Sequence, residues 1–129
     1  MKRAAIAFLA LLIMSTLVYA RGYEVDKQAG PYSVKVMLDK KPPVVGDNAV
    51  TVSIKDAAGK AVTDVKVSLN YEMPAMPGMP AMRYSAPTTL QGQVYTGKMN
   101  FSMSGAWNIK VNVMSKGGTY SIKFNTDVQ

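Results

Sequence analysis

The chain has 129 residues, of which 48% are hydrophobic and 18% charged, and its formal net charge is +7. This length suits a single domain, and the composition is that of a globular protein. The absence of Cys and His excludes disulfides and removes thiolate and imidazole chemistry, so we expect a protein that is not an enzyme. By contrast, the chain has ten methionines, and most of the functional interpretation is based on them.

Residues 1–20 have the pattern of a secretory signal peptide. Lys2 and Arg3 precede an apolar run from Ala4 to Met14, and Val18-Tyr19-Ala20 is a small-x-small cleavage site. The run is shorter than the roughly 20 residues that a spanning helix prefers. We therefore predict export to the periplasm or another extracytoplasmic space, with an uncleaved N-terminal anchor as the alternative.

The charge of the exported chain predicts a soluble surface. Loss of Lys2 and Arg3 leaves 13 basic against 8 acidic residues, a net charge of +5. The lysines are dispersed along the chain rather than clustered, which indicates a solvated surface. Together with export, this dispersion argues against nucleic acid as a partner.

After residue 30 the hydrophobic pattern alternates with a period of two, which predicts β-strands that each have one buried face. We assign 21–30 to an N-terminal extension and 31–129 to the folded domain. About seven short strands with an inward-facing Trp107 predict an all-β, immunoglobulin-like sandwich of antiparallel strands, with a small barrel as the alternative. The predicted strands cover residues 33–39, 50–55, 65–72, 88–91, 99–103, 107–113 and 120–124.

Turn residues separate these strands. Asp56-Ala57-Ala58-Gly59-Lys60 and Lys116-Gly117-Gly118 each predict a hairpin, because Gly accepts the backbone angles of tight turns.

One segment departs from the alternation. Residues 73–82 read MPAMPGMPAM, with Met at every third position and Pro after three of the four. Proline lacks a backbone donor, so this segment cannot be a central strand. Pro77 and Gly78 stand at the second and third positions of a type II turn, which would bring Met76 and Met79 within about 7 Å of each other.

Two thioethers at that distance could bind one soft cation, and Cu(I) or Ag(I) is the natural choice. We therefore take Met76 and Met79 as the primary candidate metal ligands. The secondary candidates are Met73, Met82, Met99 and Met103. Met73 and the strand pair Met99 and Met103 have a competing interpretation as core residues, since they continue alternating strand patterns. The whole loop also has a competing interpretation, as an apolar lid or an adaptable protein-binding surface.

The chain resembles the YtkA-like and FixH-like group of small exported domains, which carry a Met-Pro loop followed by a Gly- and Trp-containing strand pair. The likeness spans roughly 32–113 and rests on MPAMPGMPAM, on Gln91-Gly92-Gln93-Val94-Tyr95 and on Met103-Ser104-Gly105-Ala106-Trp107. Relatives occur alone or joined to metal-efflux adaptors and oxidase-assembly systems, which implies a link with copper. The AMPGM string is also similar to the Met-rich loop of CopC-type periplasmic copper carriers. Those proteins bind Cu(II) through His, which this chain lacks, so the similarity implies only Cu(I) binding here.

Two interpretations follow. In the first, the exported domain binds Cu(I) through the loop and transfers it. In the second, it is a metal-independent interaction module whose Met-Pro loop docks on a membrane efflux or oxidase-assembly protein.

Overall fold

The computed structural model describes residues 23–129, so the predicted signal peptide at residues 1–20 lies outside the described residues. The described chain forms nine strands: β1 (Tyr23–Ala29), β2 (Tyr32–Leu38), β3 (Gly46–Lys55), β4 (Lys66–Met73), β5 (Met82–Pro87), β6 (Thr89–Gln91), β7 (Val94–Phe101), β8 (Gly105–Ser115) and β9 (Gly118–Val128). Within residues 23–129, no helix is long and apolar enough to cross a membrane.

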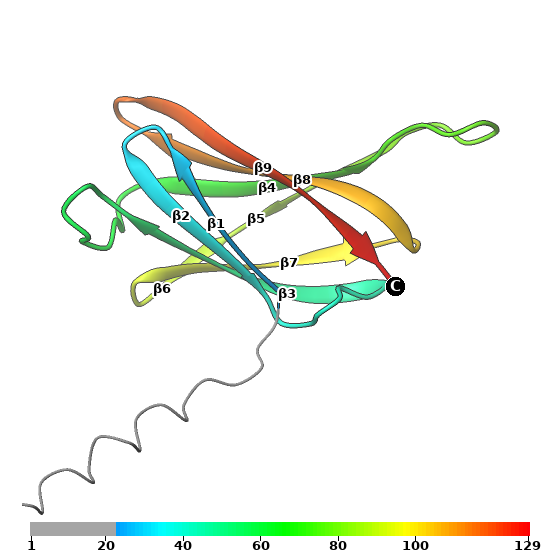
Figure 1. The fold of residues 1–129 in the computed structure, drawn as a ribbon. Helices are drawn as coiled ribbons and strands as arrows, with labels where there is room; N and C mark the ends of the chain where they lie inside the picture. The colour runs from blue at the N-terminus through cyan, green and yellow to red at the C-terminus, as the bar shows by residue number, and fades with distance from the viewer. Residues whose placement is uncertain (1–22) are drawn as a thin grey trace, which may run out of the picture.

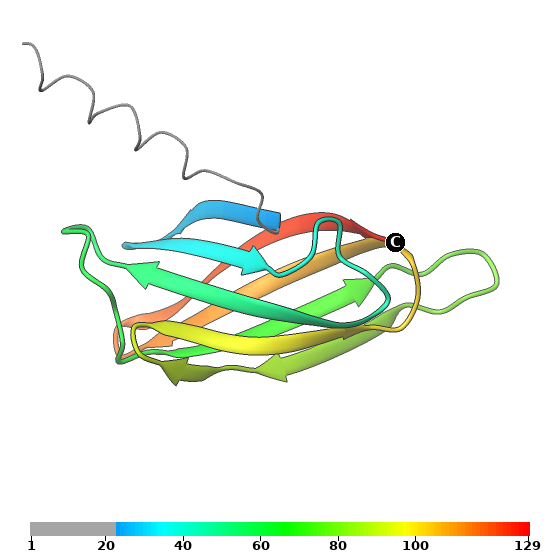
Figure 2. The same ribbon diagram turned by 90° about the horizontal axis from the view of Figure 1, so that it is seen from below.

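The strands form two antiparallel sheets that pack face to face (Figures 1 and 2). One sheet has the order β1-β2-β3-β7-β6, and the other has the order β5-β4-β8-β9. The predicted all-β sandwich is therefore confirmed. Each inner face consists of the alternating apolar residues of its strands, since successive side chains of a strand point to opposite faces.

The core lies between the sheets and contains the residues predicted to face inward. Trp107 is 0% exposed and packs against Phe101, with ring centroids 5.1 Å apart, and against Tyr71 at 6.0 Å. Its indole N–H donates to the carbonyl of Met103 at 3.0 Å. Tyr95 crosses from β7 to the segment before β4, where its hydroxyl donates to the carbonyl of Val62 at 3.0 Å. Burial raises the pKa of the Tyr95 phenol above its ordinary value.

The structure has two strands that the alternation did not predict. Residues 23–29, assigned to an N-terminal extension, form β1, which pairs with β2 along its whole length. Side chains of β1 also cover the edge of the other sheet, because Tyr23 and Lys27 donate to the carbonyls of Asn125 and Lys123. The second unpredicted strand is β5, an edge strand in which only Met82 and Ala86 are half-buried. Its alternation is too weak to be recognised in the sequence. Edge strands cover the core only partly, which weakens the periodicity of their sequence.

The turn at residues 56–60 differs from the predicted hairpin. The turn forms, with Gly59 donating to the carbonyl of Asp56 at 2.9 Å and Lys55 bridging to Ala61. However, β3 already pairs with β2 and β7, so the chain crosses to the second sheet and continues as β4. The predicted hairpin at residues 116–118 is confirmed, since β8 and β9 pair up to Ser115 and Gly118.

Candidate functional site

Residues 74–81, which join β4 to β5, extend away from one end of the sandwich as a narrow double segment (Figures 1 and 2). We call this segment the methionine arm. Its base is the pair Met73 and Met82, which are the directly opposed residues at the end of β4 and the start of β5. The arm carries Met76 and Met79 at its tip.

The tip is the type II turn that the sequence predicts. The amide of Met79 donates to the carbonyl of Met76 at 2.8 Å, and the amide of Met76 donates back to Met79 at 2.9 Å. Gly78 has a φ of 82°, the left-handed value that the third position of a type II turn requires. A pair that exchanges two hydrogen bonds has Cα atoms about 5.5 Å apart and both side chains on one face. The two thioethers therefore leave the same side of the arm.

The prolines explain why this pairing stops below the tip. Pro74 and Pro80 lack backbone donors, and neither lies in a strand or a bridge between the tip and the base. A type II turn also splays the strands that flank it. The arm therefore has a hydrogen-bonded turn at its tip, and the two segments between the tip and the base are not paired with each other.

The base is packed into the sandwich rather than presented to solvent. Met73 is 2% exposed, and its methyl carbon lies only 2.8 Å from where a side chain on Gly105 would begin. The sulfur of Met82 accepts a hydrogen bond from the hydroxyl of Ser102 at 3.6 Å. Both base methionines thus contact the turn between β7 and β8.

The remaining two candidates lie elsewhere at this end of the fold. Met99 is 0% exposed within β7, so the structure supports its interpretation as a core residue rather than as a ligand. Strand β7 ends at Phe101, so Met103 does not share its face as predicted and lies half-buried in the turn before β8. The structure brings Met76 and Met79 together, and separately places Met73 and Met82 against the turn that holds Met103.

The arm carries no charge of its own, since residues 73–82 contain only Met, Pro, Ala and Gly. The flanking residues Glu72 and Arg83 form an ion pair at 3.3 Å. Within residues 23–129, no group of three or more Asp or Glu is arranged to hold a metal ion. Thioethers are therefore the metal-binding atoms that this end of the molecule offers, and they suit soft cations.

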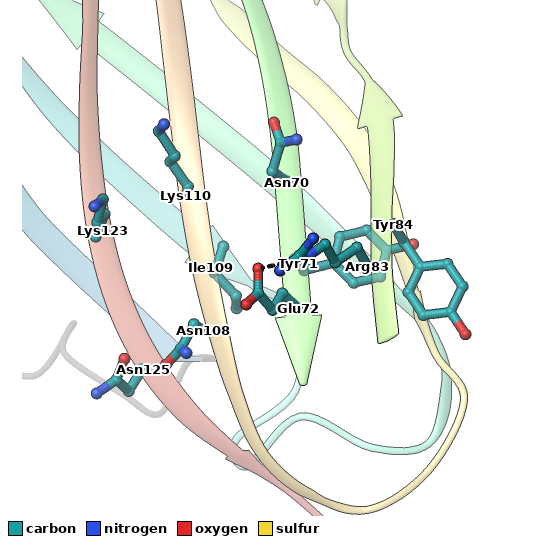
Figure 3. Close-up of a pocket in the computed structure, with 10 residues that line it drawn as sticks. All are labelled: Asn70, Tyr71, Glu72, Arg83, Tyr84, Asn108, Ile109, Lys110, Lys123 and Asn125. Carbon is teal, nitrogen blue, oxygen red and sulfur yellow. Dashed lines mark ion pairs between the residues drawn. The ribbon is translucent and has the colours of Figure 1, made fainter. Parts of the chain in front are cut away.

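An open pocket of about 470 Å³ lies beside the base of the arm, on the outer face of the second sheet (Figure 3). The Glu72–Arg83 ion pair crosses it, and Lys110 of β8 stands directly opposite Lys123 of β9. Asn108 and Asn125 form the next cross-strand pair. This lining contains no methionine and is exposed to water, so it does not compete with the arm as a site for a soft cation.

Two residues at the base were not found from the sequence. Ser102 and Gly105 have no motif that links them to the Met-Pro segment some 20 to 30 positions earlier. The pairing of β4 with β8, which places the β7–β8 turn beside the base, provides that link. The candidate ligand Met103 and the resemblance, which includes Gly105 and Trp107, pointed to this turn but not to its contact with the base.

The sequence assigns this sandwich to a known family of domains. A sequence model of the YtkA-like family matches residues 26–112, and the chain belongs to that family. No protein of curated function matches the chain in sequence.

Solved structures confirm the fold at low sequence identity. A DUF4426 family protein from Pseudomonas aeruginosa PAO1 is similar with a TM-score of 0.53 and 15% identity, covering 81% of this chain and 96% of that one. The PmoD soluble domain from Methylocystis sp. ATCC 49242 (Rockwell) is similar with a TM-score of 0.51 and 11% identity, covering 84% and 98%.

Proposed function

We propose that this chain is an exported, non-enzymatic domain that binds Cu(I) through the methionine arm and passes it to another protein. The observation that carries the proposal is the tip. Met76 and Met79 are held as a hydrogen-bonded pair by a type II turn, with Met76 44% exposed. A packing role does not account for two methionines on an arm outside the core.

Thioether ligation fits transfer better than storage. Neutral sulfur ligands leave the bound ion its full positive charge, so the site has modest affinity and releases its ion readily. The chain's net charge of +5 after signal cleavage opposes tight retention of a cation in the same way. We assign the role of acceptor to a membrane efflux or oxidase-assembly protein.

A competition experiment tests the proposal. The chain from residue 21 onward, which contains every described strand, is titrated with Cu(I) against a Cu(I) chelator. The double variant Met76→Leu/Met79→Leu keeps most of the bulk and removes both sulfurs. We expect the wild type to compete and the double variant to lose most of that competition.

The matched control is Met37→Leu/Met114→Leu. These two methionines are exposed like Met76, at 36% and 38% against 44%, but lie in β2 and β8 away from the arm. Equal competition by the wild type and the tip variant, or none by either, contradicts the proposal.

The metal-independent interaction module remains the second candidate, because the uncharged arm extends from the body as a docking element would. It gains support if the wild type does not compete for Cu(I). In that case the double variant should still dock, since Leu preserves the apolar surface of the arm.

A further inference from the structure

The tip supplies two sulfur ligands, and neither methionine of the base is placed to supply a third. Met73 is buried, and the sulfur of Met82 already accepts a hydrogen bond from Ser102. Met76 lies three positions after Met73, which is about 10 Å of extended chain. The base methionines are thus poorly placed to complete a site at the tip.

The tip of the arm lies away from the body of the sandwich. The arm extends beyond the end of the sandwich in both views, so the other strands do not cover its tip (Figures 1 and 2). An ion held by Met76 and Met79 would keep coordination positions toward solvent. A ligand from a second molecule can reach those positions without rearranging the fold.

A second copy of the same arm has the chemistry that these positions accept. It carries two more thioethers in the same paired geometry, and a two-fold arrangement lets each tip present the same surface to the other. The approach involves little charge repulsion, since residues 73–82 are uncharged and Glu72 and Arg83 form an ion pair beneath them. The net positive charge of each molecule is carried by the sandwich, away from the tip.

We propose that one Cu(I) or Ag(I) ion bridges two copies of this chain tip to tip, bound by Met76 and Met79 of each. The inference rests on the proposed function and adds to it the identity of the missing ligands. No bond within the protein is made or broken, and the ion keeps its oxidation state. The bridged pair is a half-loaded state, and excess metal should convert it to two singly loaded monomers.

Sedimentation velocity with Ag(I) in chloride-free buffer tests this. For the chain from residue 21 onward, we expect a monomer without metal and about a doubling of mass near half an equivalent of Ag(I). The dimer should decline again as Ag(I) exceeds one equivalent. Met76→Leu should abolish the dimer, whereas Met37→Leu/Met114→Leu should keep it.

The outcomes separate this inference from the proposed function. Binding of one Ag(I) per chain with a monomer at every ratio overturns the bridge and leaves the proposed function intact. Absence of Ag(I) binding contradicts both. A dimer that forms without metal, or one that survives Met76→Leu, shows association by other contacts and overturns the bridge.

Discussion

Trp107 is the largest fully buried side chain of the described residues, and it connects the two sheets at the end that carries the arm. It packs against Phe101 of the first sheet and Tyr71 of the second. Its N–H also anchors the β7–β8 turn through the carbonyl of Met103.

Trp107→Ala should therefore lower the free energy of unfolding by about 3–5 kcal/mol, as truncation of a large core side chain does. Urea denaturation followed by circular dichroism measures the change. Trp107→Phe is the companion variant, since it keeps much of the volume and loses the hydrogen bond. A change near zero for the alanine variant would mean that the ring is not buried.

Asn48 is a buried polar residue that no motif indicated. It is 0% exposed, its amide group donates to the carbonyls of Val44 and Gly46, and its oxygen accepts from the amide of Val44. One side chain thus satisfies two backbone groups of Val44, in the loop before β3, and the carbonyl of Gly46, the first residue of that strand. The predicted strand began only at residue 50, so the alternation predicted neither the buried position of Asn48 nor its hydrogen bonds.

Asn48→Ala should cost about 1–3 kcal/mol of stability, because it leaves these backbone groups without their partner. Chemical denaturation measures the loss. Asn100→Ala is the control, since Asn100 is exposed and its side chain donates only to Asp47. Its cost should be about 0.5 kcal/mol or less. Equal losses for the two variants would show that burial of Asn48 has no energetic consequence.

At the scale of the element, the arm depends on the backbone conformation of one glycine. Gly78→Ala places a side chain at a φ of 82°, which costs about 1–2 kcal/mol. If the turn preorganises the two sulfurs, Ag(I) or Cu(I) affinity should fall roughly 5- to 30-fold, the factor equivalent to that energy. Global stability should change little, because the hydrogen bonds of the tip join only Met76 and Met79.

Gly59→Ala is the matched control for this prediction. Gly59 has the same φ of 82°, and a side chain there would also meet no atom within 4 Å, but it lies in the turn after β3. We expect the strain to reduce thermal stability while metal affinity stays unchanged. An unaltered metal affinity in Gly78→Ala would show that metal binding does not depend on the hydrogen-bonded turn at the tip.

For the whole molecule, we predict that folding does not require metal. The core is a continuous set of buried apolar residues from both sheets, and of the candidate ligands only Met73 and Met99 belong to its buried part. Metal-free protein should give a β-type circular dichroism spectrum and a cooperative melt. Adding Ag(I) should raise the midpoint only by the binding energy. An unfolded spectrum without metal would contradict this.

The pH dependence of binding also belongs to this scale. A thioether has no proton to lose, so a site built from Met76 and Met79 should bind Cu(I) almost equally at pH 7 and pH 5. Chelator competition at both pH values, corrected for protonation of the chelator, measures this. A drop of about tenfold per pH unit above pH 6 would instead reveal a ligand that must lose a proton.

The sequence alone determined the sandwich, the inward Trp107 and the turn at Met76–Met79, because period-two alternation and the Pro-Gly pair act within a few residues. Only the tertiary structure decided that residues 23–29 complete the first sheet, that β3 and β4 lie in different sheets, and that Ser102 and Gly105 contact the base of the arm. These features depend on pairing between distant segments. Alternation shows which face of a strand is buried, but not which strand lies beside it, because any strand edge offers the same backbone donors and acceptors.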